Sequence, residues 1–383
     1  MTDWPRFEED ERAAVERVLR SGRVNYWNGE EGRAFEREFA AFHQAPFGVA
    51  VANGTVALEL ALHALGIGPG DDVVVAPRTF LASASSIVVR GARPVFADVD
   101  RDSGGITAET VRAALTPKTR AILAVHLAGW PCDLGALRAL ADEHGLALIE
   151  DCAQAHGATW NGRPVGSWGD AAAFSFCTDK IMSTGGEGGM LLLRDEQAWH
   201  RAWSYKDHGK GWDAVYNTEH PPGFRWLHES FGTNWRLTEM QSAIGRVQLG
   251  KLPEWLAERR ANAELLADRL ETLPGLRVPR PPQEAGHAWY KFHAFVVPEQ
   301  LAPGWSRDAV VEAIQAYGVP CLHGGCSEVY LEKAFDNTDL RPEPRLPVAR
   351  ELGETSIMFP VDHTMDATAM NAIADAVEAV LGE

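Results

Sequence analysis

The chain has 383 residues, of which 45% are hydrophobic, and its 53 acidic residues outnumber its 36 lysines and arginines to give a net charge of −17. This length and composition predict a globular protein of two or three domains, or of one large domain with an appendage. The negative charge and the lack of a basic run argue against nucleic acid as a partner, and the lack of a long apolar run argues against a membrane span.

The N-terminal segment and the cysteines both bear on location. The first residues are acidic, whereas a signal peptide needs a positive segment followed by an apolar one. The cysteines form no CxxC pair and are odd in number, being Cys132, Cys152, Cys177, Cys321 and Cys326. We therefore expect reduced thiols and a cytoplasmic protein. Cys321 and Cys326 could form a redox or metal pair, but no second pair matches them, and buried or incidental thiols are favoured.

From Gly48 onward, short β-rich runs alternate with segments whose apolar residues recur at helical spacing. The expected strands are 71–77, 92–100, 119–126, 145–155, 170–176 and 188–194. The expected helices are 55–66, 107–116 and 133–145. Nearly continuous apolar strands between helices predict an α/β domain whose sheet is mostly parallel and covered on both faces.

The pattern changes after about Asn234. Residues 238–273 predict a long helical stretch in which Pro253 is a plausible break. Residues 290–298, 306–320 and 365–383 then predict a smaller α+β domain that ends in a helix. We expect a large domain over residues 1–252, with an N-terminal helix, and a small C-terminal domain over residues 253–383.

Lys180 follows an expected strand and precedes a glycine-rich run. It therefore lies at a strand's carboxyl end, where open α/β sheets bind ligands. Ser175 lies five residues earlier, and the glycines of "STGGEGG" let the backbone approach a bound group closely. Lys180 is either a nucleophile or an exposed surface charge, and its neighbours favour the nucleophile.

Two carboxylates, Glu150 and Asp151, end another expected strand. Because side chains alternate along a strand, at most one of them faces a given pocket. A buried Asp needs a cationic partner, and a protonated pyridine nitrogen is one such partner. Considered without the other candidate residues, Asp151 could equally well be an aspartate that caps a turn.

A third candidate site is the helix start at Asn53, Gly54 and Thr55. Backbone N–H groups and the Thr hydroxyl lie there where the helix dipole favours an anion such as phosphate, although an ordinary N-cap is the commoner reading. A strand-end lysine, a strand-end carboxylate and an anion-binding helix start together make pyridoxal 5′-phosphate the economical ligand.

The sequence resembles the DegT/DnrJ/EryC1/StrS family of sugar aminotransferases, which use pyridoxal phosphate and have the fold type I of such transferases. The resemblance runs nearly from end to end. Its most specific part is the block from Asp151 to Lys180, which opens on "EDCAQ"; it also covers "NGTVALELAL", "GGEGGML" and "GTNWRLTEMQSAIGRVQL". It implies a large domain with a mostly parallel sheet flanked by helices, and a smaller C-terminal α+β domain.

The resemblance also implies roles for individual residues. Lys180 would form the covalent imine with the cofactor and later shuttle a proton, Asp151 would pair with the pyridine nitrogen, and Gln154 would bond the cofactor's phenolic oxygen. Gly54, Thr55 and Ser175 would cradle the phosphate.

Phe80 would stack on the pyridine ring, although a core phenylalanine at a helix start is nearly as good a reading. Asn234 would reach the phosphate of a neighbouring subunit, which implies a homodimer with shared sites; without the resemblance it reads as a turn residue or N-cap.

The implied reaction moves an amino group from glutamate to a nucleotide-linked keto sugar, in amino-sugar and lipopolysaccharide or other polysaccharide biosynthesis. Arg225, Arg236 and Lys210 are candidates to bind the anionic nucleotide carrier. Two departures from the family bear on the site: Asn53 replaces a serine, and the segment around His323 replaces a His-Pro sequence near the sugar site, so the substrate is expected to differ from the commonest ones.

Three other functions are less favoured. Sugar dehydratases of the same family have histidine in place of the lysine, and Lys180 argues against this activity. A non-catalytic regulatory relative would not need the intact set of Lys180, Asp151, Gln154 and Ser175. A nicotinamide enzyme would need a glycine fingerprint after the first strand, and "VAVANGTVAL" does not supply it.

Overall fold

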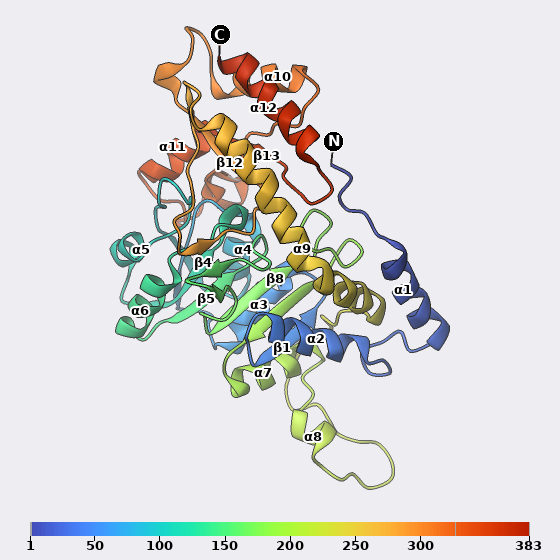
Figure 1. Cartoon of the computed structure of the whole chain (residues 1–383). Coiled ribbons are helices and arrows are strands. Elements are labelled where there is room, and N and C mark those ends of the chain that lie inside the picture. Colours follow the sequence, from blue (N-terminus) through green and yellow to red (C-terminus); the bar gives the residue numbers. More distant parts are fainter. Residues whose placement is uncertain (1, 326, 383) are drawn as a thin grey trace.

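A seven-stranded sheet forms the centre of the large domain (Figure 1), in a computed structural model that describes residues 2–325 and 327–382. The strand order is β1-β9-β8-β5-β4-β2-β3. Only β9 runs antiparallel to its two neighbours; the other pairs are parallel. The strands of this sheet are β1 (Phe47–Val51), β2 (Asp72–Val75), β3 (Arg93–Phe96), β4 (Thr119–Val125), β5 (Ala147–Asp151), β8 (Ala171–Ser175) and β9 (Gly189–Leu193). The expected α/β fold with a mostly parallel sheet is confirmed.

Helices cover the sheet, so its central strands are buried on both faces. β2, β8 and β9 are buried at every position, as a sheet packed on both sides requires. The helices of the large domain are α1 (Glu9–Ser21), α2 (Glu31–Phe42), α3 (Gly54–Ala64), α4 (Leu81–Val89), α5 (Ala108–Ala114), α6 (Leu134–His144), α7 (Glu196–Lys206) and α8 (Trp212–Tyr216). The strands and helices expected from the sequence are all present. Each is one to several residues shorter than the range that the sequence pattern predicts.

The topology gathers one set of loops at one edge. Because β1, β2, β4, β5 and β8 all point the same way, the segments that follow them emerge at the same edge of the sheet. These segments begin α3 and α4, carry Gln154 and carry Lys180. The three candidate sites of the sequence therefore share one edge.

The helix α9 (Glu239–Leu270) joins the two domains and is continuous for 32 residues, with Pro253 inside it. The predicted break at Pro253 is wrong. A proline removes one backbone hydrogen bond, but α9 packs against α1, α2 and α12 along its length, and this tertiary packing holds the helix together. The domain boundary near Leu252 stays a prediction. Buried residues of α9 join the core of the large domain up to Trp255 and that of the small domain from Ala263.

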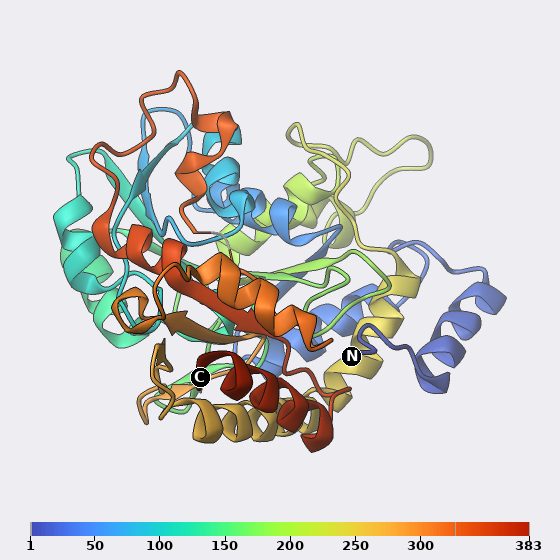
Figure 2. The same cartoon turned by 90° about the horizontal axis from the view of Figure 1, so that it is seen from above.

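The small domain is built on an antiparallel three-stranded sheet of order β10-β12-β13. Figure 2 shows its last helix lying alongside α9. Its elements are β10 (Leu276–Arg277), β12 (Phe292–Val296), β13 (Ser356–Phe359), α10 (Arg307–Ala316), α11 (Pro347–Thr355) and α12 (Ala367–Leu381). A third sheet, of order β11-β6-β7, ties the domains together; it consists of β6 (Thr159–Trp160), β7 (Arg163–Pro164) and β11 (Ala285–Gly286).

Two further features concern the surface. The segment 207–234, which we call the arm, carries α8 and a loop that project from the body (Figure 1). The exposed large side chains of the arm include Phe224, Trp226 and Phe231. Over the described part of the chain, none of the helices combines the length and the apolar character that crossing a bilayer needs.

Candidate functional site

Lys180 lies in the turn between β8 and β9, and its side chain is 15% exposed. The alternative of an exposed surface charge does not fit this burial, because the small domain covers the side chain. Its Nζ lies 3.9 Å from Asp179 Oδ1 and 5.0 Å from the centroid of the Tyr290 ring. The indole N–H of Trp4 donates to the Lys180 carbonyl at 2.7 Å and fixes its backbone. The amine is thus sheltered and held by one long ion pair.

Asp179 is shared between two neighbours. The Tyr290 hydroxyl donates a hydrogen bond to Asp179 Oδ2. Burial alone would raise the pKa of Asp179, but the charge of Lys180 and the bond from Tyr290 bring it below its usual value. Burial, and then the nearby Asp179 carboxylate, raise the pKa of Tyr290, so this hydroxyl keeps its proton. Asp179 is therefore an anion engaged mainly by Tyr290, which leaves the Lys180 amine only loosely bound.

Asp151 ends β5 and is 6% exposed. Ser83 Oγ donates to Asp151 Oδ2 at 2.7 Å, and the Ala153 N–H donates to Oδ1 at 3.1 Å. Thr79 Oγ1 lies 2.6 Å from Ser83 Oγ; because the Ser83 proton points to Asp151, Thr79 donates to Ser83. Asp151 therefore does cap a turn through one oxygen. Within the described residues no cation pairs with this buried carboxylate, which is the environment in which a cationic ligand is most favoured.

Glu150 faces the other way, as the strand alternation predicts. It accepts hydrogen bonds from the backbone N–H groups of Gly166, Trp168 and Gly169 at 2.7–3.0 Å. His126 Nε2 lies 3.2 Å from its Oε2. Glu150 thus holds the loop before β8 in place and takes no part in the Lys180 site.

Gln154 lies beside a strained turn. Its Oε1 accepts a hydrogen bond from the Ala128 N–H at 2.7 Å. This contact fixes the amide, so its NH₂ group points away from Ala128 as a donor. Ala128 has a φ of 57° and Gly129 a φ of 95°, and a Cβ on Gly129 would lie 3.0 Å from Trp289 N. The turn is therefore packed directly against the small domain.

The start of α3 packs directly on β8 and β9. A Cβ on Gly54 would lie 2.6 Å from Ser175 Cβ, and one on Gly189 would lie 2.4 Å from the Asn53 carbonyl oxygen. Asn53 is the N-cap of α3 and accepts from the Val56 N–H at 3.0 Å. The N–H groups of Gly54 and Thr55 remain at the end of the helix, next to the buried Ser175, in an arrangement that suits a phosphate.

Phe80 and Asn234 lie at the surface. Phe80 precedes α4 and is 66% exposed, so the alternative of a core phenylalanine is excluded. Asn234 is exposed, and its backbone forms a bridge with Asp207 of the arm. The adjacent Trp235 carbonyl accepts from the Ala52 N–H at 2.9 Å, which brings this end of the arm close to the start of α3. The reach of Asn234 to a second subunit stays a prediction.

The sequence profile described as the DegT/DnrJ/EryC1/StrS aminotransferase family matches residues 5–378. The chain belongs to this family. The aminotransferase is 36% identical over 365 residues, 95% of its own length and 90% of the relative's, to a protein of Streptomyces venezuelae named dTDP-3-amino-3,4,6-trideoxy-alpha-D-glucose transaminase. It is 38% identical over 87% of its length, and 84% of the relative's, to a UDP-N-acetyl-3-dehydro-alpha-D-glucosamine 3-aminotransferase of Acidithiobacillus ferrooxidans.

Among solved structures, an aminotransferase from Psychrobacter cryohalolentis is 54% identical to this protein and superposes with a TM-score of 0.98. The match covers 100% of this protein's chain and 98% of the Psychrobacter chain. The resemblance seen in the sequence and the expected fold type are thereby confirmed, and the protein is a transaminase of the pyridoxal-phosphate-dependent class. The family and its fold depend on pyridoxal phosphate in general.

Two of the three cations suggested for a nucleotide carrier are already paired in the aminotransferase. Lys210 Nζ lies 3.1 Å and Arg236 Nη1 lies 2.5 Å from the same Asp207 oxygen. Arg225 is exposed on the arm. Of these three cations, Arg225 alone forms no ion pair with another described residue of the chain.

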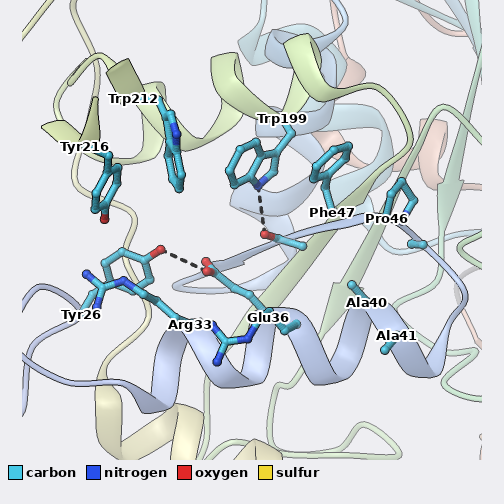
Figure 3. A pocket seen from close by; sticks show the side chains of 13 residues that line it. Tyr26, Arg33, Glu36, Ala40, Ala41, Pro46, Phe47, Trp199, Trp212 and Tyr216 are labelled. Carbon is cyan, nitrogen blue, oxygen red and sulfur yellow. Dashed lines mark hydrogen bonds between the residues drawn. The ribbon is translucent and has the colours of Figure 1, made fainter. Parts of the chain in front are cut away.

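The aromatic pocket of Figure 3 is a separate feature of the aminotransferase. It has a volume of about 450 Å³ and lies beside the start of the edge strand β1, between α2 on one side and α7 and α8 on the other. Its lining residues include Tyr26, Glu36, Phe47, Trp199, Trp212 and Tyr216. None of the site residues expected from the sequence lines this pocket.

Sequence reasoning missed several residues of the Lys180 site. Ser83 and Thr79 lie next to Phe80, but nothing in that segment marks them as partners of Asp151. Tyr290 and Lys291 precede β12 in the small domain. Their only local signal is a tyrosine and a lysine at the start of an expected strand, which is too common to identify a site.

Proposed function

We propose that this transaminase transfers an amino group from glutamate to a keto sugar carried on a nucleotide. The observation that carries the proposal is the set of groups at one sheet edge: a sheltered amine at Lys180, a buried carboxylate at Asp151 and the start of α3 beside Ser175. The names of the two relatives, both aminotransferases of nucleotide-linked sugars, support the substrate class.

The residues at this edge fit pyridoxal phosphate. Asp151 is a buried acid that has no cationic partner among the residues the structure describes, so it suits a protonated ring nitrogen. The N–H groups of Gly54 and Thr55 with the Ser175 hydroxyl suit the phosphate, and the close packing at Gly54 keeps side-chain atoms out of that space. The exposed ring of Phe80 suits stacking on the pyridine, and the donor NH₂ of Gln154 suits the phenolic oxygen.

When bound, pyridoxal phosphate supplies an aldehyde that condenses with amines and a ring that withdraws electrons from the adjacent carbon. The Lys180 amine is the group that would hold the aldehyde and later move the proton of the donor's α-carbon. The Asp151 carboxylate would hold the proton on the ring nitrogen, while Ser83 orients this carboxylate through Oδ2. The small domain above Lys180 would exclude water from the amine.

We further propose a homodimer in which Asn234 completes the partner's phosphate site. The exposed aromatic side chains of the arm support an interface at this place, because large apolar groups on a projecting segment are typical of surfaces that become covered. The relatives' names support a role in amino-sugar biosynthesis, and our proposal extends this role to polysaccharide biosynthesis. The four cysteines that the structure describes are free thiols, as a cytoplasmic location would require, and Cys326 lies outside the described residues.

The test uses the purified protein with added pyridoxal phosphate. We expect absorption at the violet edge of the visible range, bleaching with borohydride, and a reduced adduct on the peptide that contains Lys180. A panel of nucleotide-linked keto sugars is then incubated with glutamate, with glutamine as the comparison donor, and products are identified by mass. Labelling of a different lysine, or no aminated sugar with either donor, would refute the proposal.

A further inference from the structure

A second lysine lies beside the Lys180 site, at the seam between the two domains. Lys291 Nζ and Lys180 Nζ are each 5.0 Å from the centroid of the Tyr290 ring. The two amines therefore lie within twice that distance of each other. Tyr290 is 7% exposed, so the ring that both amines approach is packed in the protein.

The backbone fixes Lys291 relative to the large domain. The Tyr290 N–H donates to the Ala128 carbonyl at 2.9 Å, and the Ala288 N–H donates to the Gly129 carbonyl at 2.9 Å. The same Ala128 donates its own N–H to Gln154. The position of Lys291 is thus tied, through one turn, to a residue proposed to touch the cofactor.

Lys291 is half-buried, yet its amine has neither an ion pair nor a hydrogen bond within residues 2–325 and 327–382. Burial, and then the cation of Arg259, lower the pKa of Lys291; the carboxylates of Asp362 and Asp179 oppose this shift, and Lys180 adds to it by a smaller amount. An ammonium group that is partly removed from water and unpaired is unfavourable, and an incoming anion would relieve that penalty.

Lys291 lines a small enclosed cavity of about 20 Å³ between the domains. Ala128 and Ser103 of the large domain and Trp289 and His293 of the small domain also line it. Burial, and then the nearby cations, lower the pKa of His293 to about 3, so this imidazole is neutral. A space of this size holds about one water molecule, which suits a carboxylate oxygen and excludes a diphosphate.

We propose that Lys291 binds a carboxylate of the amino donor. This inference rests on the proposed function, in which a dicarboxylic amino acid must bring its α-carbon to the Lys180 amine. The carboxylates of such a donor lie only a few bonds from that carbon, and the two amines lie no farther apart than twice 5.0 Å, so one donor can reach both. The keto sugar carries its negative charge on a bulky diphosphate, which the cavity does not fit.

The test compares the two halves of the reaction in the holoenzyme. Lys291→Met is compared with wild type and with Lys291→Arg, which keeps the charge. The rate with glutamate is followed by the change in cofactor absorption, and the rate with the keto sugar is followed from the aminated cofactor form. We expect Lys291→Met to lower kcat/KM for glutamate roughly 10- to 100-fold, as loss of one hydrogen bond to a charged group does, and to leave the keto-sugar half within about 3-fold. Lys291→Arg should recover most of the loss.

Binding of glutarate, a dicarboxylate without an amine, gives a second readout that needs no turnover. Calorimetry should show tighter binding to wild type than to Lys291→Met by a similar factor. Equal glutarate affinity, or an equal loss in both half-reactions, would overturn the inference while leaving the proposed function intact. If wild type aminates no sugar with any dicarboxylic donor, the proposed function fails and this inference fails with it.

Discussion

Two lysines that are both largely shielded from solvent show how a structural site differs from a reactive one. Lys206, whose neighbours Glu36 and Tyr26 line the pocket of Figure 3, has a fully buried side chain, and its Nζ lies 2.7 Å from Glu36 Oε1 and 4.1 Å from the Tyr26 ring centroid. Lys180 has a side chain that is 15% exposed, and its nearest carboxylate oxygen is 3.9 Å away.

The difference lies in the surrounding groups. Glu36 also accepts hydrogen bonds from Tyr26 and from the Ala50 N–H, so the buried pair around Lys206 is satisfied on several sides. At Lys180 the carboxylate of Asp179 is engaged by Tyr290. A lysine that must exchange partners is left loosely held, whereas a lysine that supports the fold is bound at short distance. Burial alone does not separate the two cases.

The largest effect is expected from Lys180→Ala. Activity should fall roughly 10⁴-fold or more, because the amine that handles the proton is lost, while the fold remains because its one ion pair is long. Turnover, borohydride labelling and thermal unfolding of the variant measure these expectations. Global unfolding would show that Lys180 has the structural role that we assign to Lys206.

Lys206→Met should give the opposite result. Removing one partner of a buried ion pair leaves Glu36 uncompensated and should lower the free energy of unfolding by about 3–5 kcal/mol. The folded fraction should keep its ability to bind the cofactor. Denaturant unfolding measures the loss, and the double variant Lys206→Met/Glu36→Leu is the matched control, since it should recover part of the stability. A loss of turnover without a loss of stability would contradict the comparison.

Asp151→Asn removes the charge that we assign to the ring nitrogen. Turnover should fall about 10²- to 10³-fold, a typical loss for a preorganised electrostatic contact. Cofactor should still bind, because the phosphate cradle is unchanged. Cofactor titration and single-turnover kinetics separate the two quantities, and a rate like that of wild type would remove Asp151 from the mechanism.

Ser83→Ala should have the smallest effect. It removes one hydrogen bond to a carboxylate, worth about 1.5–3 kcal/mol, so we expect roughly a tenfold or somewhat larger loss in kcat with little change in KM. Ser83→Thr keeps the hydroxyl and serves as the control. The pH dependence of the cofactor spectrum should shift in Ser83→Ala if Ser83 acts by orienting Asp151; an unchanged spectrum with an unchanged rate would make it a packing residue only.

The sequence by itself determined the kinds of group present and the edge at which they gather. Alternating strand and helix patterns predict the parallel sheet, and strands of one direction must end at one edge, so the sequence alone places Lys180, Asp151 and the start of α3 together. The strand period also separated Glu150 from Asp151 correctly, because that period is a local property of the backbone.

Only the tertiary structure decided which groups become partners. Ser83 and Asp151 are 68 positions apart, and Tyr290 and Asp179 are 111 apart, so no local pattern links them. The continuity of α9 through Pro253 was decided in the same way, because packing on both domains outweighs one lost hydrogen bond. Local periodicity follows from backbone geometry, whereas the surroundings of a charge depend on which distant segments the fold brings against it.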